Sequence, residues 1–356
     1  MQWFRACLLT LLLASANAYA QTEKFDTVKV AEGVYATVRR DSPGLAAEAN
    51  NVFIINADDV IVVDTNISAS STREVLSALR KLTPKPVSYV VNTHWHDDHV
   101  LGNQVYVEAF PGVEFVAHAR TREYLPALGL SRRQQALAGV PGFLQRLTDL
   151  LAKNTSLAGG PLTEEERAAY SNDLKIGERF AAETPAARVV LPTLTVEDHL
   201  TLHRGGRTIE IRHLGRGHTA GDLVVHLPAE GIVVAGDLVV WPVPYVGAEQ
   251  SHVGEWAATL DKLLALRPNV IVPGHGPVMR EDSYVRLLAR MFASVKQQTD
   301  AAVARGETLE QARGSVSLEE FRKQIVGDSQ FRAVLFRSYV AGPAVAAAYR
   351  EATGKQ

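Results

Sequence analysis

The segment NTHWHDDHVLGN, residues 92–103, constrains the fold of this chain more than any other stretch. It places three histidines and two aspartates in the six positions from His94 to His99, although the 356 residues include only 11 histidines. The string directly follows the apolar run Val87–Val91, which is typical of a buried strand. Polar clusters at strand ends are typical of the active-site loops of layered α/β folds, so we expect a functional site here.

The spacing within this string favours a metal site. His94 and His96 lie on the same side of an extended segment, because side chains alternate across a strand. Asp98 and His99 come where the chain must turn toward Leu101 and can therefore point into the same cavity from another direction. Imidazole and carboxylate groups are common zinc ligands. A solvated surface turn is the alternative interpretation, and the buried strand before the string argues against it.

Three later segments each place a further potential ligand at the end of an expected strand. His218 lies in the glycine-flanked turn 217–222, and Asp237 lies just past the apolar run Ile232–Ala235. His275 lies in the rigid turn PGHGP that follows Val270–Val272. Strand ends at one edge of a layered fold would collect these side chains in a shared site.

Taken in order, these segments resemble the successive motifs of the metallo-β-lactamase superfamily over roughly residues 30–280. The resemblance implies seven metal ligands: His94, His96 and His218 for a first ion, Asp98, His99 and His275 for a second, and Asp237 bridging both. It also implies that Asp64 is a buried aspartate that orients a ligand histidine. The expected catalytic residues are Asp98, which could orient the nucleophile or shuttle its proton, and His218.

The expected cofactor is a pair of divalent metal ions. Zinc is favoured by three imidazoles and a carboxylate, and iron or manganese would also fit the second set of nitrogen and oxygen ligands. Two such ions hold a hydroxide at neutral pH and polarise a carbonyl or phosphoryl oxygen. The expected reaction is attack by metal-bound hydroxide without a covalent enzyme intermediate.

One departure from the family pattern bears on the substrate. The best-known antibiotic-hydrolysing subclass has a cysteine where this chain has Asp237. A full set that includes this aspartate resembles instead the thioester, lactone and phosphoester hydrolases of the superfamily. We therefore expect hydrolysis of a small ester, thioester, lactone or cyclic amide, with β-lactams possible substrates. The alternatives are a phosphodiesterase of the same fold and a non-catalytic metal-binding or partner-binding protein.

The run of expected elements predicts an α/β fold. Two batches of short β-branched strands, each closed by helices, indicate a four-layer αββα sandwich of two mainly antiparallel or mixed sheets with helices outside. We expect one domain over residues 21–280, a helical insertion at about 119–184 and a C-terminal helical extension over 281–356. The insertion could be a lid or an oligomer surface, and the oligomeric state stays open.

Three helix starts are predicted from capping-box spacing, in which a Ser or Thr precedes a Glu or Gln by three positions. They are Ser71 to Glu74, Ser131 to Gln134, and Thr163 to Glu166. The first opens a helix expected to end at Leu82.

The N-terminus predicts export. Arg5, an apolar run and the small-residue site Ala18-Tyr19-Ala20 are typical of a signal peptide over residues 1–20, with cleavage after Ala20 and a periplasmic or secreted product. Cleavage removes Cys7, the only cysteine, so neither a disulfide nor thiolate chemistry is expected. We expect no stable membrane insertion after cleavage.

The expected partner is a small-molecule substrate rather than a nucleic acid. The formal net charge is −2 and no basic run occurs, which argues against a polyanion as the main partner.

The remaining polar features carry weaker signals. Asp222 is expected to fix the His218 turn by hydrogen bonding, and segment 241–245 could form an aromatic pocket wall or pack in the core. Six histidines lack motif context and are expected to be structural, with His213 and His252 the first to reconsider: His118, His199, His203, His213, His226 and His252.

Overall fold

The computed structural model describes residues 25–40, 44–247 and 249–354. The expected signal peptide and Cys7 lie outside the described residues. The strands are β1 (Phe25–Ala31), β2 (Val34–Arg39), β3 (Asn51–Ile55), β4 (Val60–Val63), β5 (Val87–Val91), β6 (Glu114–His118), β7 (Leu194–Val196), β8 (His199–Arg204), β9 (Arg207–Arg212), β10 (Val224–Leu227), β11 (Ile232–Val240) and β12 (Val270–His275).

These strands form two mixed sheets. The first has seven strands in the order β1 to β7, antiparallel as far as β4 and parallel from β4 to β7. The second has five strands in the order β12-β11-β10-β9-β8, and only the β11–β12 pair is parallel. The parallel pairs bring the carboxyl ends of β4 and β5 to one edge of the first sheet, and those of β11 and β12 to one edge of the second.

The period-two pattern of the strands divides the core into layers, as β4 illustrates. Ile61 and Val63 point toward the second sheet and pack with residues such as Ile211 and Val234. Val60 and Val62 point the other way and pack with apolar side chains of the first helix, such as Leu79. Strand β4 is therefore buried on both faces, which explains its continuous apolar sequence.

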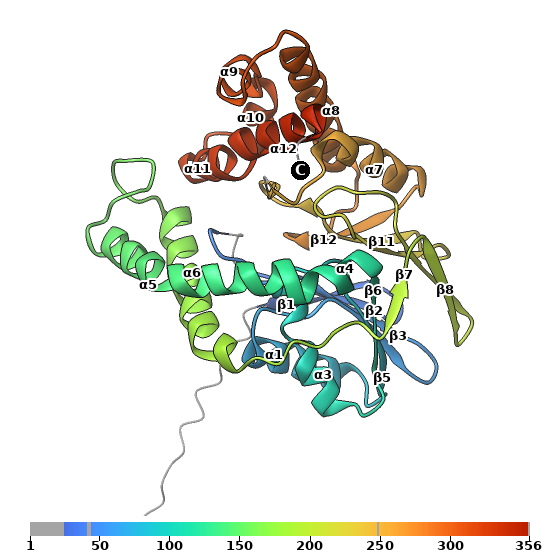
Figure 1. Ribbon diagram of the computed structural model, residues 1–356. Helices are drawn as coiled ribbons and strands as arrows, with labels where there is room; N and C mark the ends of the chain where they lie inside the picture. Colours follow the sequence, from blue (N-terminus) through green and yellow to red (C-terminus); the bar gives the residue numbers. More distant parts are fainter. Residues whose placement is uncertain (1–24, 41–43, 248, 355–356) are drawn as a thin grey trace, which may run out of the picture.

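The helices cover the outer faces of both sheets (Figure 1). Their bounds are α1 (Ala69–Leu82), α2 (Asp97–Val100), α3 (Asn103–Ala109), α4 (Ala119–Tyr124), the π-helical η1 (Leu125–Gly129), α5 (Leu130–Ala152), α6 (Glu164–Glu183), the 3-10 helix η2 (Thr184–Ala186), α7 (Val253–Ala265), α8 (Ser283–Ala304), α9 (Leu309–Ser315), α10 (Glu319–Val326), α11 (Gln330–Phe336), the π-helical η3 (Arg337–Ala341) and α12 (Gly342–Thr353).

The predicted four-layer arrangement is confirmed. Helices α1 and α3 pack on the outer face of the first sheet, and α7 and α8 pack on the second, with one apolar core between the sheets and one under each helical layer. In Figure 1 the C-terminal helices gather at the top of the view, next to α7, and α5 and α6 lie at the left, below α11.

One of the three predicted helix starts is correct. Thr163 caps α6 in a capping box with Glu166. The other two are wrong. Helix α1 begins three residues earlier than the Ser71 cap, because Ser68 is the N-cap and its side chain accepts from the Ser71 N–H. Ser131 lies inside continuous helix, since α4, η1 and α5 follow one another without a break and no cap is needed there.

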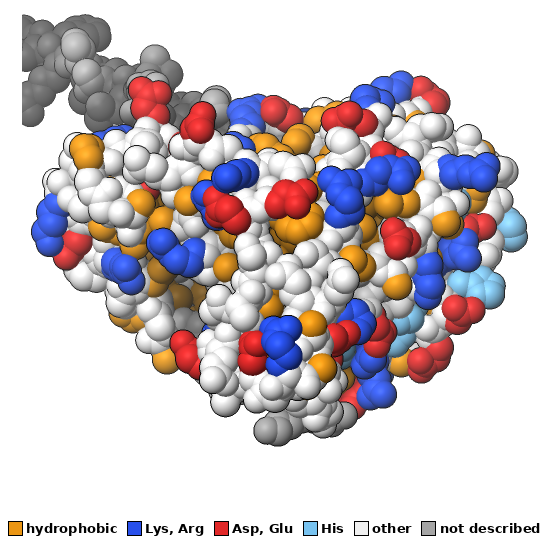
Figure 2. Space-filling model, turned by 90° about the horizontal axis from the view of Figure 1, so that it is seen from above, with side chains coloured by type: hydrophobic (Ala, Val, Ile, Leu, Met, Phe, Trp, Pro, Cys, Tyr) orange, Lys and Arg blue, Asp and Glu red, His pale blue; other side chains and the backbone are white. Residues whose placement is uncertain are grey.

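The surface and the helices add two observations. Basic and acidic side chains are interspersed over the face drawn in Figure 2, and no continuous patch of one sign covers it. Among the described residues, no helix combines the length and the apolar character needed to cross a membrane.

Candidate metal centre

The seven residues singled out in the sequence come together where strand ends from both sheets meet. His94 and His96 lie in the loop after β5, and Asp98 and His99 lie on α2, which follows at once. His218 belongs to the loop between β9 and β10. Asp237 lies within β11, and His275 ends β12. Their ligand atoms form two groups, each with all its atoms within 4.8 Å of one another.

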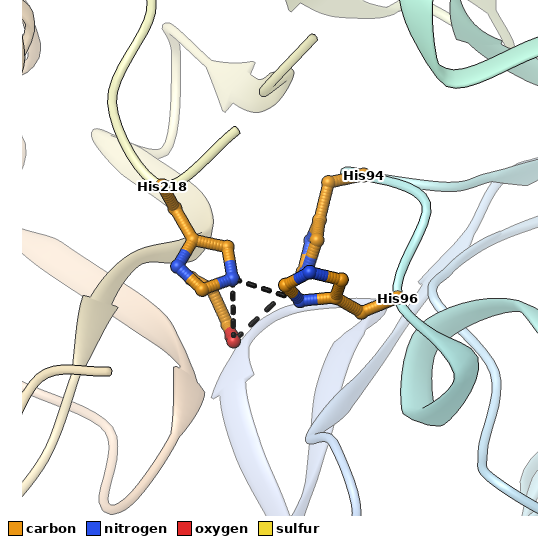
Figure 3. A group of neighbouring side chains, drawn as sticks. His94, His96 and His218 are labelled. Carbon is orange, nitrogen blue, oxygen red and sulfur yellow. Dashed lines mark hydrogen bonds and ion pairs between the residues drawn. The ribbon is translucent and has the colours of Figure 1, made fainter. Parts of the chain in front are cut away.

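The first group consists of His94, His96, His218 and Asp237. His218 Nε2 lies 2.9 Å from His96 Nδ1 and 3.5 Å from Asp237 Oδ2, and the same carboxylate oxygen lies 3.9 Å from His94 Nε2. Figure 3 shows the three imidazoles converging from two separate loops. Three ring nitrogens and one oxygen thus face a common point.

The second group consists of Asp98, His99 and His275. His275 Nε2 lies 3.1 Å from Asp98 Oδ2, and His99 Nε2 lies 3.4 Å from the same oxygen. Asp237 Oδ1 lies 3.4 Å from each of these two nitrogens. Asp237 therefore directs one oxygen to each group, which is the geometry of a bridging carboxylate.

The outer nitrogens of three imidazoles are held by hydrogen bonds that leave the inner nitrogens free. His218 Nδ1 donates to the Tyr245 carbonyl oxygen at 3.1 Å, and His275 Nδ1 donates to the Glu48 carbonyl oxygen at 3.2 Å. His94 Nδ1 lies 3.1 Å from the Thr93 hydroxyl. Such contacts fix the tautomer and orientation of metal-binding histidines.

Asp64 performs the same task for His99, as the resemblance implied. Its Oδ2 lies 2.8 Å from His99 Nδ1 and accepts from the Thr93 hydroxyl at 2.8 Å, while Oδ1 accepts from the Thr93 N–H at 2.7 Å. Asp64 is buried and has a φ of 58°, a left-handed conformation that Asp and Asn tolerate better than other residues with a side chain. One carboxylate thus orients both ends of the histidine string.

The donor set fits divalent metal ions. His94 Nε2, His99 Nε2 and Asp237 Oδ1 are buried and have no hydrogen-bond partner. Burying such atoms without a partner costs free energy, and a cation at the common point would satisfy them. All donors are nitrogen or oxygen, so zinc, iron and manganese remain compatible.

Burial keeps the imidazoles of the first group neutral. It lowers the pKa of His94 and His96 well below the ordinary value, and it lowers the pKa of His218 to about 4. Neutral imidazole is the form that binds a metal. These three rings therefore present lone pairs at neutral pH.

The second group balances opposite charges. Burial opposes ionisation, but His99 and His275 hold the pKa values of Asp98 and Asp237 well below the ordinary range. In return, against the effect of burial, the carboxylates raise the pKa of His275 to about 9 and that of His99 well above its ordinary value. This attraction between buried charges marks a position where positive charge is stabilised.

The turn that carries His218 is fixed from two sides. Asp222 accepts from the Thr219 N–H, as expected, and from the Thr219 hydroxyl. Ser251 donates to the His218 carbonyl oxygen at 2.8 Å. No motif pointed to Ser251, because its partner lies 33 positions away in the sequence.

The two histidines to be reconsidered lie at the periphery of the site. His213 donates from Nδ1 to the Asp222 carbonyl oxygen at 2.9 Å and has its ring centroid 4.4 Å from that of His118. His252 is the N-cap residue of α7. Neither belongs to the two ligand groups. Both support the loop around His218 through its neighbours.

A pocket of about 580 Å³ opens over the metal centre, and four of the seven residues line it: His96, Asp98, Asp237 and His275. We call the seven residues the floor. The walls of the pocket come from α5, α6 and the α11–η3 segment, together with loops 44–47 and 240–245. Helices α5 and α6 and the C-terminal helices thus meet over one site. Residues 242, 243 and 245 line this pocket, as the pocket-wall interpretation of segment 241–245 predicted. Val243 is also part of the apolar core, so the prediction of core packing holds as well.

Sequence reasoning missed the charged residues of these walls. Arg133 of α5 binds Asp97 of the histidine string, with Nε 3.0 Å from Oδ2, and both side chains are largely buried. Arg132 lies beside it and lines the pocket. The pair Arg132-Arg133 stands in an ordinary amphipathic helix, so no local pattern marks it.

The family comparison covers the whole floor. A family model described as the metallo-beta-lactamase superfamily matches residues 46–275. This range contains all seven floor residues and ends at His275, and the helices from α8 onward lie outside it.

Curated relatives are distant. The chain is 27% identical over 272 residues to a linear primary-alkylsulfatase of Pseudomonas sp. (strain ATCC 19151), covering 73% of this chain and 48% of that protein. It is 22% identical over 284 residues to a metallo-beta-lactamase type 2 of Elizabethkingia meningoseptica, covering 77% and 88%. The chain therefore spans about half the length of the alkylsulfatase that it matches.

Solved structures show the same fold. The inverting sec-alkylsulfatase Pisa1 from Pseudomonas sp. aligns with a TM-score of 0.64 at 18% identity, covering 93% of this chain and 51% of that one. The metallo-beta-lactamase DIM-1 aligns with a TM-score of 0.50 at 18% identity, covering 76% and 98%. Likenesses at this identity concern the fold alone.

Proposed function

The chain belongs to the metallo-β-lactamase superfamily, and on that premise we propose that it is a binuclear metal-dependent hydrolase of small esters, thioesters, lactones or cyclic amides. Members of this superfamily bind divalent metals, typically zinc. The observation that carries the proposal is Asp237, which directs one carboxylate oxygen to each of two ligand groups. A site built to hold a single ion would not need that arrangement.

The floor residues form two sets of ligands, one for each ion. His94, His96 and His218 would hold the first, and Asp98, His99 and His275 the second, with Asp237 shared. When bound, two divalent cations supply a hydroxide nucleophile at neutral pH and polarise the scissile carbonyl oxygen. We assign zinc as the favoured metal because imidazole nitrogen predominates in the first group.

The protein's own groups orient the reaction. Asp98 is the floor carboxylate that stands 20% exposed to the pocket, so it can accept a hydrogen bond from the nucleophile and pass its proton to the leaving group. The Tyr245 carbonyl oxygen holds His218 with Nε2 facing the common point. The apolar walls limit water around the substrate.

Metal content and substrate class test the proposal together. Elemental analysis of the purified protein is expected to give about two divalent ions per chain, on the count of two ligand groups. The same preparation is assayed on an ester, a thioester, a lactone, a chromogenic cephalosporin and a phosphodiester. Asp237→Asn is expected to lose one or both ions and to lower kcat/KM by roughly a thousandfold.

Asp198→Asn is the matched control, because the Asp198 side chain is exposed and, among the described residues, forms an ion pair only with His199. It should keep both the metal and the activity. A metal-loaded protein that cleaves none of the panel would contradict the hydrolase and favour a metal-binding or partner-binding role. Cleavage of the phosphodiester alone would favour the phosphodiesterase.

Sulfate-ester hydrolysis is a second candidate. The alkylsulfatase of Pseudomonas sp. is 27% identical over 73% of this chain. Two metallo-β-lactamase relatives, which cover 77% and 66% of the chain, are 22% and 23% identical to it. Adding a primary alkyl sulfate to the panel separates the two candidates. Release of sulfate without cleavage of the carboxylic esters would replace the first candidate by the second.

We also propose that the protein is exported and that residues 21–280 form the catalytic unit, with the insertion and residues 281–356 shaping its substrate pocket. The signal-peptide pattern over residues 1–20 supports export. Mass spectrometry of the protein recovered from cell fractions tests it. A mature N-terminus at Gln21 in the periplasm or medium is expected, and an intact Met1 in the cytoplasm would contradict it.

A further inference from the structure

The pocket above the floor is polar at its base and apolar around its sides. Six apolar or aromatic side chains line its walls: Val140 and Phe143 on α5, Ile176 and Phe180 on α6, and Leu335 and Tyr339 on α11–η3. A volume of about 580 Å³ lies within the range of small-molecule sites. Walls of this kind bind an apolar body, because burying hydrocarbon surface is favourable.

Both π-helical segments of the structure border this pocket. Gly129 ends η1 and Tyr339 lies in η3, and both residues line the cavity. Single π-turns inserted into α-helices are often found at functional sites, where they redirect side chains. The two helical walls therefore share a feature that regular packing helices lack.

The charges around the pocket leave one cation facing it. Asp98 and Asp237 belong to the floor, where bound metal ions would take their charge, and Asp97 pairs with Arg133. Arg132 is exposed, lines the pocket and has no Asp or Glu of the described residues within ion-pair distance.

Two aromatic residues orient Arg132. Its guanidinium carbon lies 5.6 Å from the centre of a Trp95 ring, and Nη2 donates to the Tyr245 hydroxyl at 3.2 Å. Trp95 precedes His96, and the ring centroid of Tyr245 lies 6.4 Å from that of His96. The Arg132 guanidinium thus lies beside the floor, and none of its N–H donors binds a carboxylate of the described residues.

We propose that the substrate is an anionic amphiphile, with its hydrocarbon body between α5, α6 and η3 and its carboxylate-type or sulfonate-type anion on Arg132. This assignment rests on the proposed function only in that the scissile bond would lie over the floor. A guanidinium binds such oxyanions with two parallel hydrogen bonds, which gives both affinity and orientation. The pocket then selects substrates by chain length and by negative charge.

Binding of 1-decanesulfonate to the zinc-loaded protein, measured by calorimetry, tests the anion site. This probe has no ester bond and is not consumed, so its binding is measurable whether or not the protein hydrolyses anything. Arg132→Gln is expected to weaken binding roughly tenfold, because a charged hydrogen-bonding partner is lost. Arg132→Lys should retain more of the affinity than Arg132→Gln.

Arg146→Gln is the matched control, because Arg146 is exposed on the same helix and does not line the pocket. It should bind the probe like the unchanged protein. Equal affinities of the Arg132→Gln variant and the unchanged protein would overturn the anion site.

Two glycines of α5 allow an equally sharp test of the apolar walls. A Cβ added at Gly139 or at Gly142 meets no atom within 4 Å, so the first carbon of a side chain fits at either position. Gly139 lines the pocket and Gly142 does not. Both substitutions to leucine should favour the helix to a similar extent, because each replaces a glycine in a helix interior.

Sulfonates from hexane to decane are expected to bind the unchanged protein roughly fourfold tighter for each added methylene that is buried. Gly139→Leu should flatten this dependence and Gly142→Leu should leave it unchanged. A dependence that is equal in both variants would overturn the apolar site. Tight binding of the probes by a protein that hydrolyses no substrate would reject the proposed function and keep this inference.

Discussion

The floor and the walls of the pocket are built by different means. Four of the seven floor residues come from a single string of six positions, and the others lie in the β9–β10 loop, within β11 and at the end of β12. The walls come from α5, α6 and η3, segments that lie up to about 200 positions apart and share no motif. Metal chemistry demands particular ligand types at fixed spacing, whereas an apolar wall only demands hydrocarbon at the right place.

Side chains of α5 and α6 hold the segments next to the floor, and one further residue stabilises each region alone. Asp173 of α6 binds loop 44–47, which leads to Glu48 and so to His275, and Arg133 of α5 binds Asp97 of the histidine string. Asp64 acts only within the floor, and Thr163 only within the walls. Changing each in turn asks whether floor and walls are independent units.

Asp173 of α6 gives the largest expected effect, a dependence of stability on pH. Its carboxylate accepts from the backbone N–H groups of Leu45 and Ala46, on the loop that leads to Glu48 and so to His275. Burial raises the pKa of Asp173 to about 7 from 3.8. Between about pH 4 and 7 the folded protein holds a proton that the unfolded chain has released, so the free energy of unfolding falls as the pH rises.

Asp173→Asn removes this proton and should become more stable relative to the unchanged protein as the pH rises from 4 to 8, by at most about 4 kcal/mol. Urea denaturation at pH 5 and pH 8 measures the difference. An unchanged difference at the two pH values would contradict the assignment. Asp149→Asn, at an aspartate of α5 whose side chain is 48% exposed, is the control and should show no comparable trend.

Arg133→Met breaks the ion pair between α5 and the histidine string. Leaving the largely buried Asp97 without its partner should lower the free energy of unfolding by about 3 kcal/mol. The double variant with Asp97→Asn should recover part of the loss, because the uncompensated charge is gone. Chemical denaturation of the three proteins measures the coupling, and strictly additive effects would show that the contact does not join the regions.

Asp64→Asn tests the floor alone. Asparagine suits the left-handed backbone at this position, so the fold should survive, but the contact with His99 loses its charge. Metal affinity, measured by competition with a chelator, is expected to fall roughly 10- to 100-fold. Probe binding between the walls should not change. An unaltered metal affinity would remove Asp64 from the site.

Thr163→Ala tests the walls alone and should have the smallest effect. It removes the side-chain oxygen that caps α6 and accepts from the Glu166 N–H, which should cost about 1 kcal/mol of stability. Thr163→Ser keeps the cap and is the control. Metal content should be the same in both variants, and a loss of metal would mean that the walls and the floor do not fold independently.

Much of the fold followed from local pattern. The strand β4 alternates between two cores, as its four consecutive apolar residues allow, and the capping box at Thr163 begins α6 as predicted. The predictions at Ser71 and Ser131 both failed for local reasons. Ser68 was available as an earlier cap, and Ser131 lies in a helix that had already begun.

The sequence by itself determined the ligand set, because a metal site needs particular donor atoms and these stand in short strings at strand ends. Only the tertiary structure decided what surrounds it. Arg132, Ser251 and Tyr339 contact residues far away in the chain. The residues next to them in sequence therefore do not predict these contacts. Packing forces are non-directional and many side chains can satisfy them, so the shape of the pocket is fixed only when the whole chain is folded.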